Sequence, residues 1–366
     1  MNETKRVKWT TAPNGVGMWA VTDYHLARSV LADKRFSRAA AVLPGVPRLS
    51  ITDPAPESII SLDGSDHARM RRFVVGAFTE RRLQELQPFI EKTVSECMET
   101  LSEQGPPADF VSTVAQPLPL RVLSHMLGVP SSDREIFGSW VSVLFDLTGN
   151  QEENRSHAFG LTRYMSGLVA QKRRDPGDDL LSNLVQLKDR GEGLSTRELI
   201  TLCLSLLMAG YETTIDQITL CVLSLLYDPS LAAALRADPD LTPSVVEELI
   251  RLSPSAFVSF ARVTREPVRL DDVTIEPGQP VVVFILGANH STLPAGEGEN
   301  ARAGHLTFGH GVHRCLGAPL ARMQLATVIR ALVERFPRLA IAEDPGTFNW
   351  KTGMATRGLT ELRVRW

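Results

Sequence analysis

The segment FGHGVHRCLG, which ends at Gly317, contains the residue with the clearest chemical potential in this chain, Cys315. Gly309, Gly311 and Gly317 let the backbone turn tightly and approach a flat partner closely, where a Cβ atom would clash. A strongly helical stretch over residues 319–336 follows at once. Free N–H groups and the dipole at the start of a helix stabilise a thiolate. The pattern therefore favours Cys315 as an anionic metal ligand.

Two other interpretations of Cys315 compete with this one. A lone cysteine is most often a small buried side chain. We expect that role for Cys97, Cys203 and Cys221. A zinc site is the second alternative, because the same loop is rich in histidine: His305, His310 and His313. Structural zinc sites usually have paired ligands at short spacing, commonly with two or more cysteines. The spacing of these residues therefore makes a zinc site a less favoured interpretation of Cys315.

A second unusual segment, AGYETT, begins at Ala209 inside a long apolar stretch that predicts one helix over residues 199–226. Residues 195–198 form a capping box before it. A buried carboxylate is costly without a partner or a task, which singles out Glu212. Threonine hydroxyls can bond the preceding turn and open the helix locally, and Gly210 makes that distortion less costly. Glu212 beside Thr213 could organise the short water chain that proton delivery requires.

Two pairs of polar residues at helical spacing complete the candidates. Glu248 and Arg251 lie three residues apart, and His67 and Arg71 lie four apart, so each pair shares one helix face. Each pair alone is a weak signal, because an exposed ion pair contributes little to stability. The order of the two pairs along the chain, relative to the two segments above, is more informative than either pair alone.

Taken together, these segments resemble the cytochromes P450 over essentially the whole chain. The resemblance implies that the Cys315 thiolate is the axial ligand of haem iron, with haem b as cofactor. It implies that Glu212 and Thr213 relay protons to dioxygen, and that Glu248 and Arg251 have a structural role. Basic residues would hold the haem propionates. The residues implied to bind the cofactor are His67, Arg71, Ala209, Gly210, Arg262, Phe308, Gly309, His313, Cys315 and Gly317.

The resemblance also implies a largely apolar substrate pocket. It places residues 45–60 and 141–159 around that pocket, together with Ser255. The pocket residues that it implies are Ser205, Met208, Ala209, Ala256, Phe257, Val258 and Met354.

Composition agrees with a cytoplasmic enzyme. The 366 residues are 43% hydrophobic, enough for a large core, and the formal net charge of -3 gives no electrostatic case for nucleic acid or an anionic membrane. The N-terminal residues lack the apolar core of a signal peptide. Gly210 and Glu212 interrupt the apolar helix, which argues against a membrane span. Four widely spaced cysteines suit a reducing compartment.

The expected fold class is mainly α with minor β, a single P450 domain over residues 1–366, with the haem between a long distal helix and the proximal cysteine loop. Two alternating segments, 268–275 and 280–286, predict a small sheet around the turn at Gly278. Helices are expected at 23–31, 66–78, 84–103, 118–127, 134–147, 157–174 and 180–189.

Two departures from the family pattern stand out. The N-terminus is slightly shortened, because the customary first helix is missing. The segment 289–307 is also short, and Arg302 is the candidate for the arginine that joins the Glu248–Arg251 pair. Neither departure affects Cys315 or Glu212.

The function that the resemblance implies is that of a monooxygenase. It would hydroxylate or epoxidise a mostly apolar small molecule in secondary-metabolite biosynthesis. The resemblance implies that the electrons come from a ferredoxin or flavodoxin. Because the chain has no Gly-x-Gly-x-x-Gly fingerprint, we expect the NAD(P)H-dependent reductase to be a separate protein. A monomer is expected. P450-type oxidative coupling or desaturation, and a non-catalytic haem protein that recruits partners, are the alternatives. Candidates for a basic docking patch are Arg69, Arg72, Arg314 and Arg322.

Overall fold

The structure is a computed structural model that describes residues 6–12, 14–46, 55–133, 136–137, 140, 151–291, 304–352 and 356–366. They fall into two compact units, each made of two chain segments. Unit 1 comprises Met1–Arg69 and Glu247–Ala318, and unit 2 comprises Met70–Val246 and Pro319–Trp366. The single domain expected from the sequence stays a prediction, and the two units are described separately.

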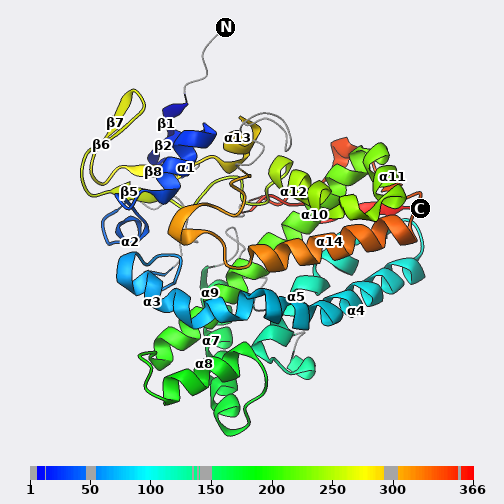
Figure 1. Cartoon of the computed structure of the whole chain (residues 1–366), viewed down its shortest axis with the longest axis horizontal. Coiled ribbons are helices and arrows are strands. Elements are labelled where there is room, and N and C mark those ends of the chain that lie inside the picture. The colour runs from blue at the N-terminus through cyan, green and yellow to red at the C-terminus, as the bar shows by residue number, and fades with distance from the viewer. Residues whose placement is uncertain are drawn as a thin grey trace. The chain divides into compact units, whose positions relative to one another are not determined.

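Unit 1 is built on a five-stranded sheet with the order β1-β2-β8-β5-β3. Its strands are β1 (Val7–Thr11), β2 (Gly17–Val21), β3 (Phe36–Ser37), β5 (Arg262–Thr264) and β8 (Pro280–Val283). The pairing of β2 with β8 is parallel, with Trp19 opposite Val281, and the other pairings are antiparallel. Helix α1 (Tyr24–Ala32) lies beside this sheet (Figure 1). Its apolar face, including Tyr24 and Val30, packs into the same core as Val21 and Val283.

The strands predicted at 268–275 and 280–286 pair differently from the expectation. The first segment folds back on itself as the hairpin β6 (Val268–Leu270) and β7 (Val273–Ile275). Asp271 has a positive φ of 58° at the turn. Strand β8 joins the larger sheet instead of pairing with this hairpin. The alternating pattern identified β structure correctly, but a two-residue turn of aspartates was misinterpreted as part of one strand.

Shorter elements complete unit 1. They are α2 (Arg38–Ala41), α13 (Ile285–His290) and a 3-10 turn, η6 (Gly311–His313). Three helices begin in one unit and end in the other: α3 (Gly64–Val75), α12 (Thr242–Leu252) and α14 (Ala318–Arg335).

Unit 2 is mostly helical (Figure 1). Its helices include α4 (Glu80–Gln104), α5 (Pro117–Leu127), α7 (Gln151–Arg174), α8 (Leu180–Asp189), α9 (Thr196–Gly210), α10 (Glu212–Tyr227) and α11 (Pro229–Ala237). Helices α5, α7 and α9 each contact α8, and α9 also contacts α5 and α7. A small sheet has the order β4-β10-β9, from β4 (Ala108–Asp109), β9 (Ala340–Ile341) and β10 (Arg363–Arg365). These bounds confirm the predicted helices, except that residues 134–147 lie almost entirely outside the described part.

The predicted long helix forms as two consecutive helices, α9 and α10 (Figure 1). The two helices meet at Tyr211. Helix α9 starts at the predicted capping box, in which Ser195 accepts from the Glu198 amide at 3.1 Å and Glu198 accepts from the Ser195 amide at 2.9 Å. The stretch Thr196–Tyr227 is long and apolar enough to cross a membrane by length and composition. Half of the most apolar 18-residue window of this stretch is buried inside the protein.

Candidate functional site

The cysteine loop of unit 1 holds Cys315 at the surface, just before α14 begins at Ala318. The Cys315 amide donates to the carbonyl oxygen of Phe308 at 2.8 Å, which closes the loop at its base. The Gly309 amide donates to the Leu306 carbonyl oxygen at 2.8 Å. Gly309 and Gly311 have φ values of +69° and +73°, which other residues adopt at a cost. The predicted tight turn is therefore present, with the thiol exposed.

Helix α1 packs directly against this loop. A Cβ atom added at Gly311 would lie 2.8 Å from the carbonyl oxygen of Leu31 and 2.9 Å from Cα of Ala32. Both are backbone atoms, so they cannot rotate away. Arg28, also on α1, donates from Nε to His310 Nε2 at 3.3 Å. The glycine at position 311 is thus required by close packing as well as by its backbone angle.

Basic side chains of unit 1 form a second group. Arg262, on β5, is buried with 5% of its surface exposed. Burial, and then the nearby charge of Arg38, lower the pKa of Arg262 to about 10, and Asp63 opposes this effect. Among the described residues no hydrogen bond or ion pair reaches the Arg262 guanidinium. The rings of His67 and His313 lie 4.2 Å apart, centroid to centroid.

Asp63 ties this basic group to the sheet, and sequence reasoning missed it. Its carboxylate accepts from the Ser37 hydroxyl at 2.6 Å and from the Ala39 amide at 3.0 Å, and it contacts His313 Nε2 at 3.4 Å. Although burial disfavours the charged form, these hydrogen bonds hold the pKa of Asp63 well below its usual range. The only sequence signal was an acid four residues before His67.

The donor set of unit 1 suits haem. A buried guanidinium that makes no hydrogen bond or ion pair in the described part is costly, and a carboxylate of a bound ligand would offset that cost. Haem propionates are such carboxylates, and Arg262 with His313 would receive them. The exposed Cys315 thiol, on a glycine-rich loop at a helix start, would supply a thiolate ligand for the haem iron.

The zinc interpretation fits this geometry less well. The described part of the chain contains no cluster of three or more His, Cys, Asp or Glu side chains that could hold a metal ion. Each histidine of the loop has another partner: His310 contacts Arg28, His313 contacts Asp63, and His305 lies 3.3 Å from Glu247. The other three cysteines are buried as expected, and burial raises the pKa of Cys203 and Cys221 to about 12.

The predicted Glu248–Arg251 pair forms in unit 1. Arg251 donates to Glu248 from Nε at 2.7 Å and from Nη2 at 2.5 Å. Its remaining nitrogen, Nη1, donates to the carbonyl oxygen of Asn289 at 2.7 Å. Asn289, fully buried, also accepts from the Leu306 amide at 2.8 Å and donates to Thr307 at 2.9 Å. The pair therefore extends to the start of the cysteine loop. Arg302, the candidate third member, lies outside the described residues.

In unit 2 the long apolar helix is interrupted at Tyr211, inside the polar segment that predicted a local opening. Tyr211 has φ −86° and ψ −79°, between α9 and α10. The Thr213 hydroxyl donates to the Ala209 carbonyl oxygen, one turn back, which is the expected hydroxyl–backbone bond. Gly210 has a packing reason as well, because a Cβ there would lie 3.0 Å from Cδ2 of Leu123 on α5.

Glu212 opens α10 and is buried, with 5% of its surface exposed. Its carboxylate accepts a hydrogen bond from Lys351 Nζ, and the same ammonium donates to Asp216 at 2.7 Å. Burial, and then the charge of Asp216, raise the pKa of Glu212 despite Lys351. Sequence reasoning missed Lys351 and Asp216. The spacing of Glu212 and Asp216, four residues apart on one helix face, was the available signal.

The predicted pocket residues belong to both units. Ser205 is buried and donates to the Thr201 carbonyl oxygen at 2.7 Å, and Ala209 is exposed. Met208, Ala256, Phe257 and Val258 are half-buried. Met354 and residues 47–54 and 141–150 lie outside the described part. Each unit by itself contains side chains of the expected kinds.

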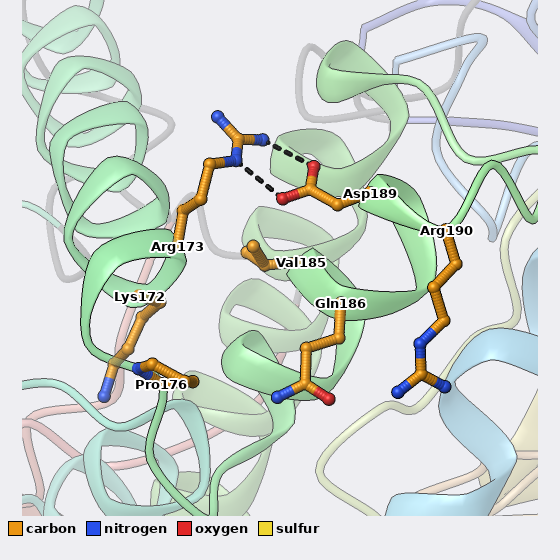
Figure 2. Close-up of a pocket in the computed structure, with 7 residues that line it drawn as sticks. All are labelled: Lys172, Arg173, Pro176, Val185, Gln186, Asp189 and Arg190. Carbon is orange, nitrogen blue, oxygen red and sulfur yellow. Dashed lines mark hydrogen bonds and ion pairs between the residues drawn. The ribbon is translucent and has the colours of Figure 1, made fainter.

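A surface pocket of about 270 Å³ lies between α7 and α8 in unit 2 and contains none of the predicted site residues (Figure 2). It is lined by Lys172, Arg173, Pro176, Val185, Gln186, Asp189 and Arg190. Arg173 pairs with Asp189 through bonds of 2.7 and 2.9 Å, and Lys172 pairs with Asp179 at 2.6 Å. Two of its three cations are therefore neutralised, and the pocket has no evident chemistry.

Comparison with known proteins gives consistent matches. A family model for cytochrome P450 matches residues 109–292 and 295–356. The chain is 37% identical to mycinamicin IV hydroxylase/epoxidase of Micromonospora griseorubida, over all of this chain and 94% of that protein. It is 37% identical to nocardicin C N-oxygenase of Nocardia uniformis, over 97% of this chain and 91% of that protein.

Among solved structures, the putative thioether synthase SgvP, involved in the tailoring of griseoviridin, superposes with a TM-score of 0.92 at 38% identity. That match covers all of this chain and 94% of SgvP.

Proposed function

The chain belongs to the cytochrome P450 family, and from that premise we propose what its residues do. The protein is a cytochrome P450 monooxygenase with a haem-iron cofactor, and we assign haem b. The observation that carries this assignment is Cys315, exposed on its glycine-rich loop in the unit that also buries Arg262.

Each group of residues has a task in this proposal. Haem supplies dioxygen activation with two electrons and two protons. The Cys315 thiolate would hold its iron, and Arg262, His67, Arg71 and His313 would hold its propionates. Glu212 takes up a proton, and the Thr213 hydroxyl passes it on through ordered water. Glu248 and Arg251 stabilise the start of the cysteine loop.

The substrate we propose is a mostly apolar small molecule of secondary metabolism. Relatives named for mycinamicin IV and nocardicin C support this class. Half-buried Met208 and Phe257 provide apolar contacts, and buried Ser205 provides one polar group. The favoured reaction is hydroxylation or epoxidation, as in the name of the mycinamicin relative.

A second reaction type has its own support. SgvP is described as a putative thioether synthase, so a structure very similar to this one is linked by its description to bond formation. Oxidative coupling on the same haem is therefore the alternative. A non-catalytic haem protein is less favoured, because it has no use for the buried Glu212 beside Thr213.

We propose that a ferredoxin or flavodoxin delivers the electrons, from a separate NAD(P)H-dependent reductase. Arg72 and Arg314 are exposed, and they would attract an acidic partner. The buried thiols of Cys97, Cys203 and Cys221 suit a cytoplasmic location. We also propose that the enzyme works as a monomer.

The test is a carbon-monoxide difference spectrum of the reduced protein. The wild type is expected to show the strongly red-shifted Soret band of thiolate-ligated haem. Cys315→Ala should lose that band, whereas Cys203→Ala, which removes a buried thiol, should keep it. A wild-type band at the ordinary histidine-haem position, or retention of the red-shifted band in Cys315→Ala, would refute the assignment.

A further inference from the structure

Four side chains of unit 2, Glu212, Asp216, Lys351 and Thr356, form one buried group, here named the Lys351 cluster. Lys351 Nζ donates to Glu212 and, at 2.7 Å, to Asp216. The Thr356 hydroxyl donates to the second oxygen of Asp216 at 2.6 Å. The exposed side-chain fractions are 7% for Glu212, 0% for Asp216 and 15% for Lys351. Two carboxylates therefore share one ammonium away from bulk water.

The two carboxylates are held unequally. Asp216 bonds to Lys351 and Thr356, one partner for each oxygen. A Cβ atom added at Gly358 would overlap Oδ1 of Asp216, so the backbone there lies directly against the carboxylate. Among the described residues, the Glu212 carboxylate accepts a hydrogen bond from Lys351 only. Asp216 thus holds the lysine in place, and Glu212 depends on a cation that another carboxylate already binds.

The backbone around Lys351 is also fixed. Its amide donates to the Gly358 carbonyl oxygen at 2.9 Å, and the neighbouring residues Trp350 and Leu359 form an antiparallel bridge. Arg357 stacks on the Trp350 ring, 4.2 Å from its centroid. The C-terminal segment therefore presents Lys351 to α10 in a defined position, so the cluster is a built feature of the fold.

Charge makes this arrangement consequential for Glu212. Three titratable groups face it: Asp216 and Tyr211 on its own helix segment, and Lys351 from the C-terminal segment. Burial and then Asp216 raise the pKa of Glu212, while Lys351 opposes them. Although burial disfavours its charge, Asp216 and Glu212 raise the pKa of Lys351, which therefore stays cationic. One positive charge faces two carboxylates, and the less firmly held carboxylate takes up a proton first.

We propose that Asp216 and Lys351 are positioning residues that act on Glu212 in opposite senses and together set the pH range over which Glu212 exchanges protons. This inference rests on the proposed function, in which Glu212 supplies protons. The O–H bond of protonated Glu212 breaks as the proton leaves through water, and the carboxylate recovers a proton from solvent. Lys351 keeps its charge throughout.

Two variants separate the roles of the two residues. Asp216→Asn removes the like charge and leaves Lys351 to Glu212 alone, so the midpoint of the Glu212 titration should fall by about one pH unit or more. Lys351→Met removes the cation, so the midpoint should rise by a similar amount. Lys351→Arg restores a cation and should bring the midpoint back toward the wild type.

The matched control is Asp179→Asn. Asp179 is also a buried aspartate of unit 2, paired with Lys172 at 2.6 Å, and it belongs to a different cluster. Its loss should destabilise the protein to a comparable extent without moving the Glu212 midpoint.

The measurement is an infrared pH titration of the purified holoenzyme, labelled with carbon-13 in glutamate only. The label shifts the carboxyl band of protonated glutamate away from that of aspartate, and loss of the band in Glu212→Gln assigns it. A Glu212 midpoint that does not move in Asp216→Asn, or that moves upward, would overturn the proposal. A midpoint that moves equally in Asp179→Asn would also overturn it, because the effect would then be general destabilisation.

This readout separates the inference from the proposed function. The infrared midpoint reports the cluster whether or not substrate is turned over. Failure of the proposed function would instead appear as a missing red-shifted Soret band. When both hold, the pH dependence of product formed per electron consumed should shift in the same direction as the infrared midpoint in Asp216→Asn and Lys351→Met.

Discussion

Arg251 and Asn289 bond each other reciprocally in unit 1. Arg251 Nη1 donates to the Asn289 carbonyl oxygen at 2.7 Å, and the Asn289 side-chain amide donates to the Arg251 carbonyl oxygen at 3.0 Å. Asn289 also accepts from the Leu306 amide. The end of α12, the end of α13 and the start of the cysteine loop are therefore joined through one fully buried amide.

Replacing Asn289 should lower the stability of the protein substantially. Asn289→Ala leaves the buried Leu306 amide and the Arg251 carbonyl without their partners, so the free energy of unfolding should fall by about 3 kcal/mol. Urea denaturation measures this change. Asn183→Ala, at an exposed position on α8, should change it by less than about 0.5 kcal/mol. Equal effects of the two substitutions would show that the Asn289 network adds nothing to stability.

Alanine should be tolerated much less well at position 311 than at position 278, although the two glycines have similar positive φ values. Gly311→Ala drives a Cβ into backbone atoms of α1, and Gly278→Ala, at φ +80°, meets nothing within 4 Å. The control should lose about 1 kcal/mol from backbone strain alone. Gly311→Ala should lose at least about twice that, and should bind haem less tightly by equilibrium titration. Similar losses in both proteins would mean that the contact with α1 is unimportant.

Thr213→Ala should uncouple electron consumption from product formation. Removing the hydroxyl beside Glu212 interrupts proton delivery, so more hydrogen peroxide should be released per electron pair. Thr219→Ala is the matched control, because its buried hydroxyl also bonds the carbonyl one turn back, to Ile215 at 2.9 Å. The measurement is peroxide formed against NAD(P)H oxidised. Equal coupling in wild type and Thr213→Ala would remove the relay role from Thr213.

Asp63 should make the free energy of unfolding depend on pH. Its folded-state pKa lies below the unfolded value of about 3.9, so its stabilising contribution is complete above that value and is lost as the pH falls further. Asp63→Asn should therefore lower the free energy of unfolding by about 2 kcal/mol at pH 7, and the difference from wild type should shrink below about pH 4. Asp175→Asn, at an exposed position, should leave the stability at pH 7 unchanged. A constant Asp63→Asn difference across the acid range would contradict this assignment.

Charge reversal at Arg72 and Arg314 should slow electron transfer. Both side chains are exposed, and glutamate at these positions would repel an acidic ferredoxin, with a reduction rate about tenfold lower at low ionic strength. The difference should disappear at high salt, because screening removes long-range attraction. Stopped-flow reduction tests this. The exposed Arg236→Glu on α11 should change the rate little, and an equal effect there would mean that only net charge matters.

Local patterns in the sequence determined the elements and the most reactive residues. The glycines around Cys315, the apolar run with its polar insertion, and the capping box at Ser195 act over a few residues, so they could be recognised without a fold. The Glu248–Arg251 pair likewise needs only one helical turn.

Only the tertiary structure decided the partners of these residues. Lys351 reaches Glu212 across 139 positions of sequence, Asp63 reaches His313 across 250, and Gly311 rests on α1. The pairing of β8 with β2 rather than with the neighbouring hairpin is of the same kind. A charged residue far away in sequence carries no local mark of its partner, because the electrostatic and packing energies that select it exist only after distant segments have been brought together.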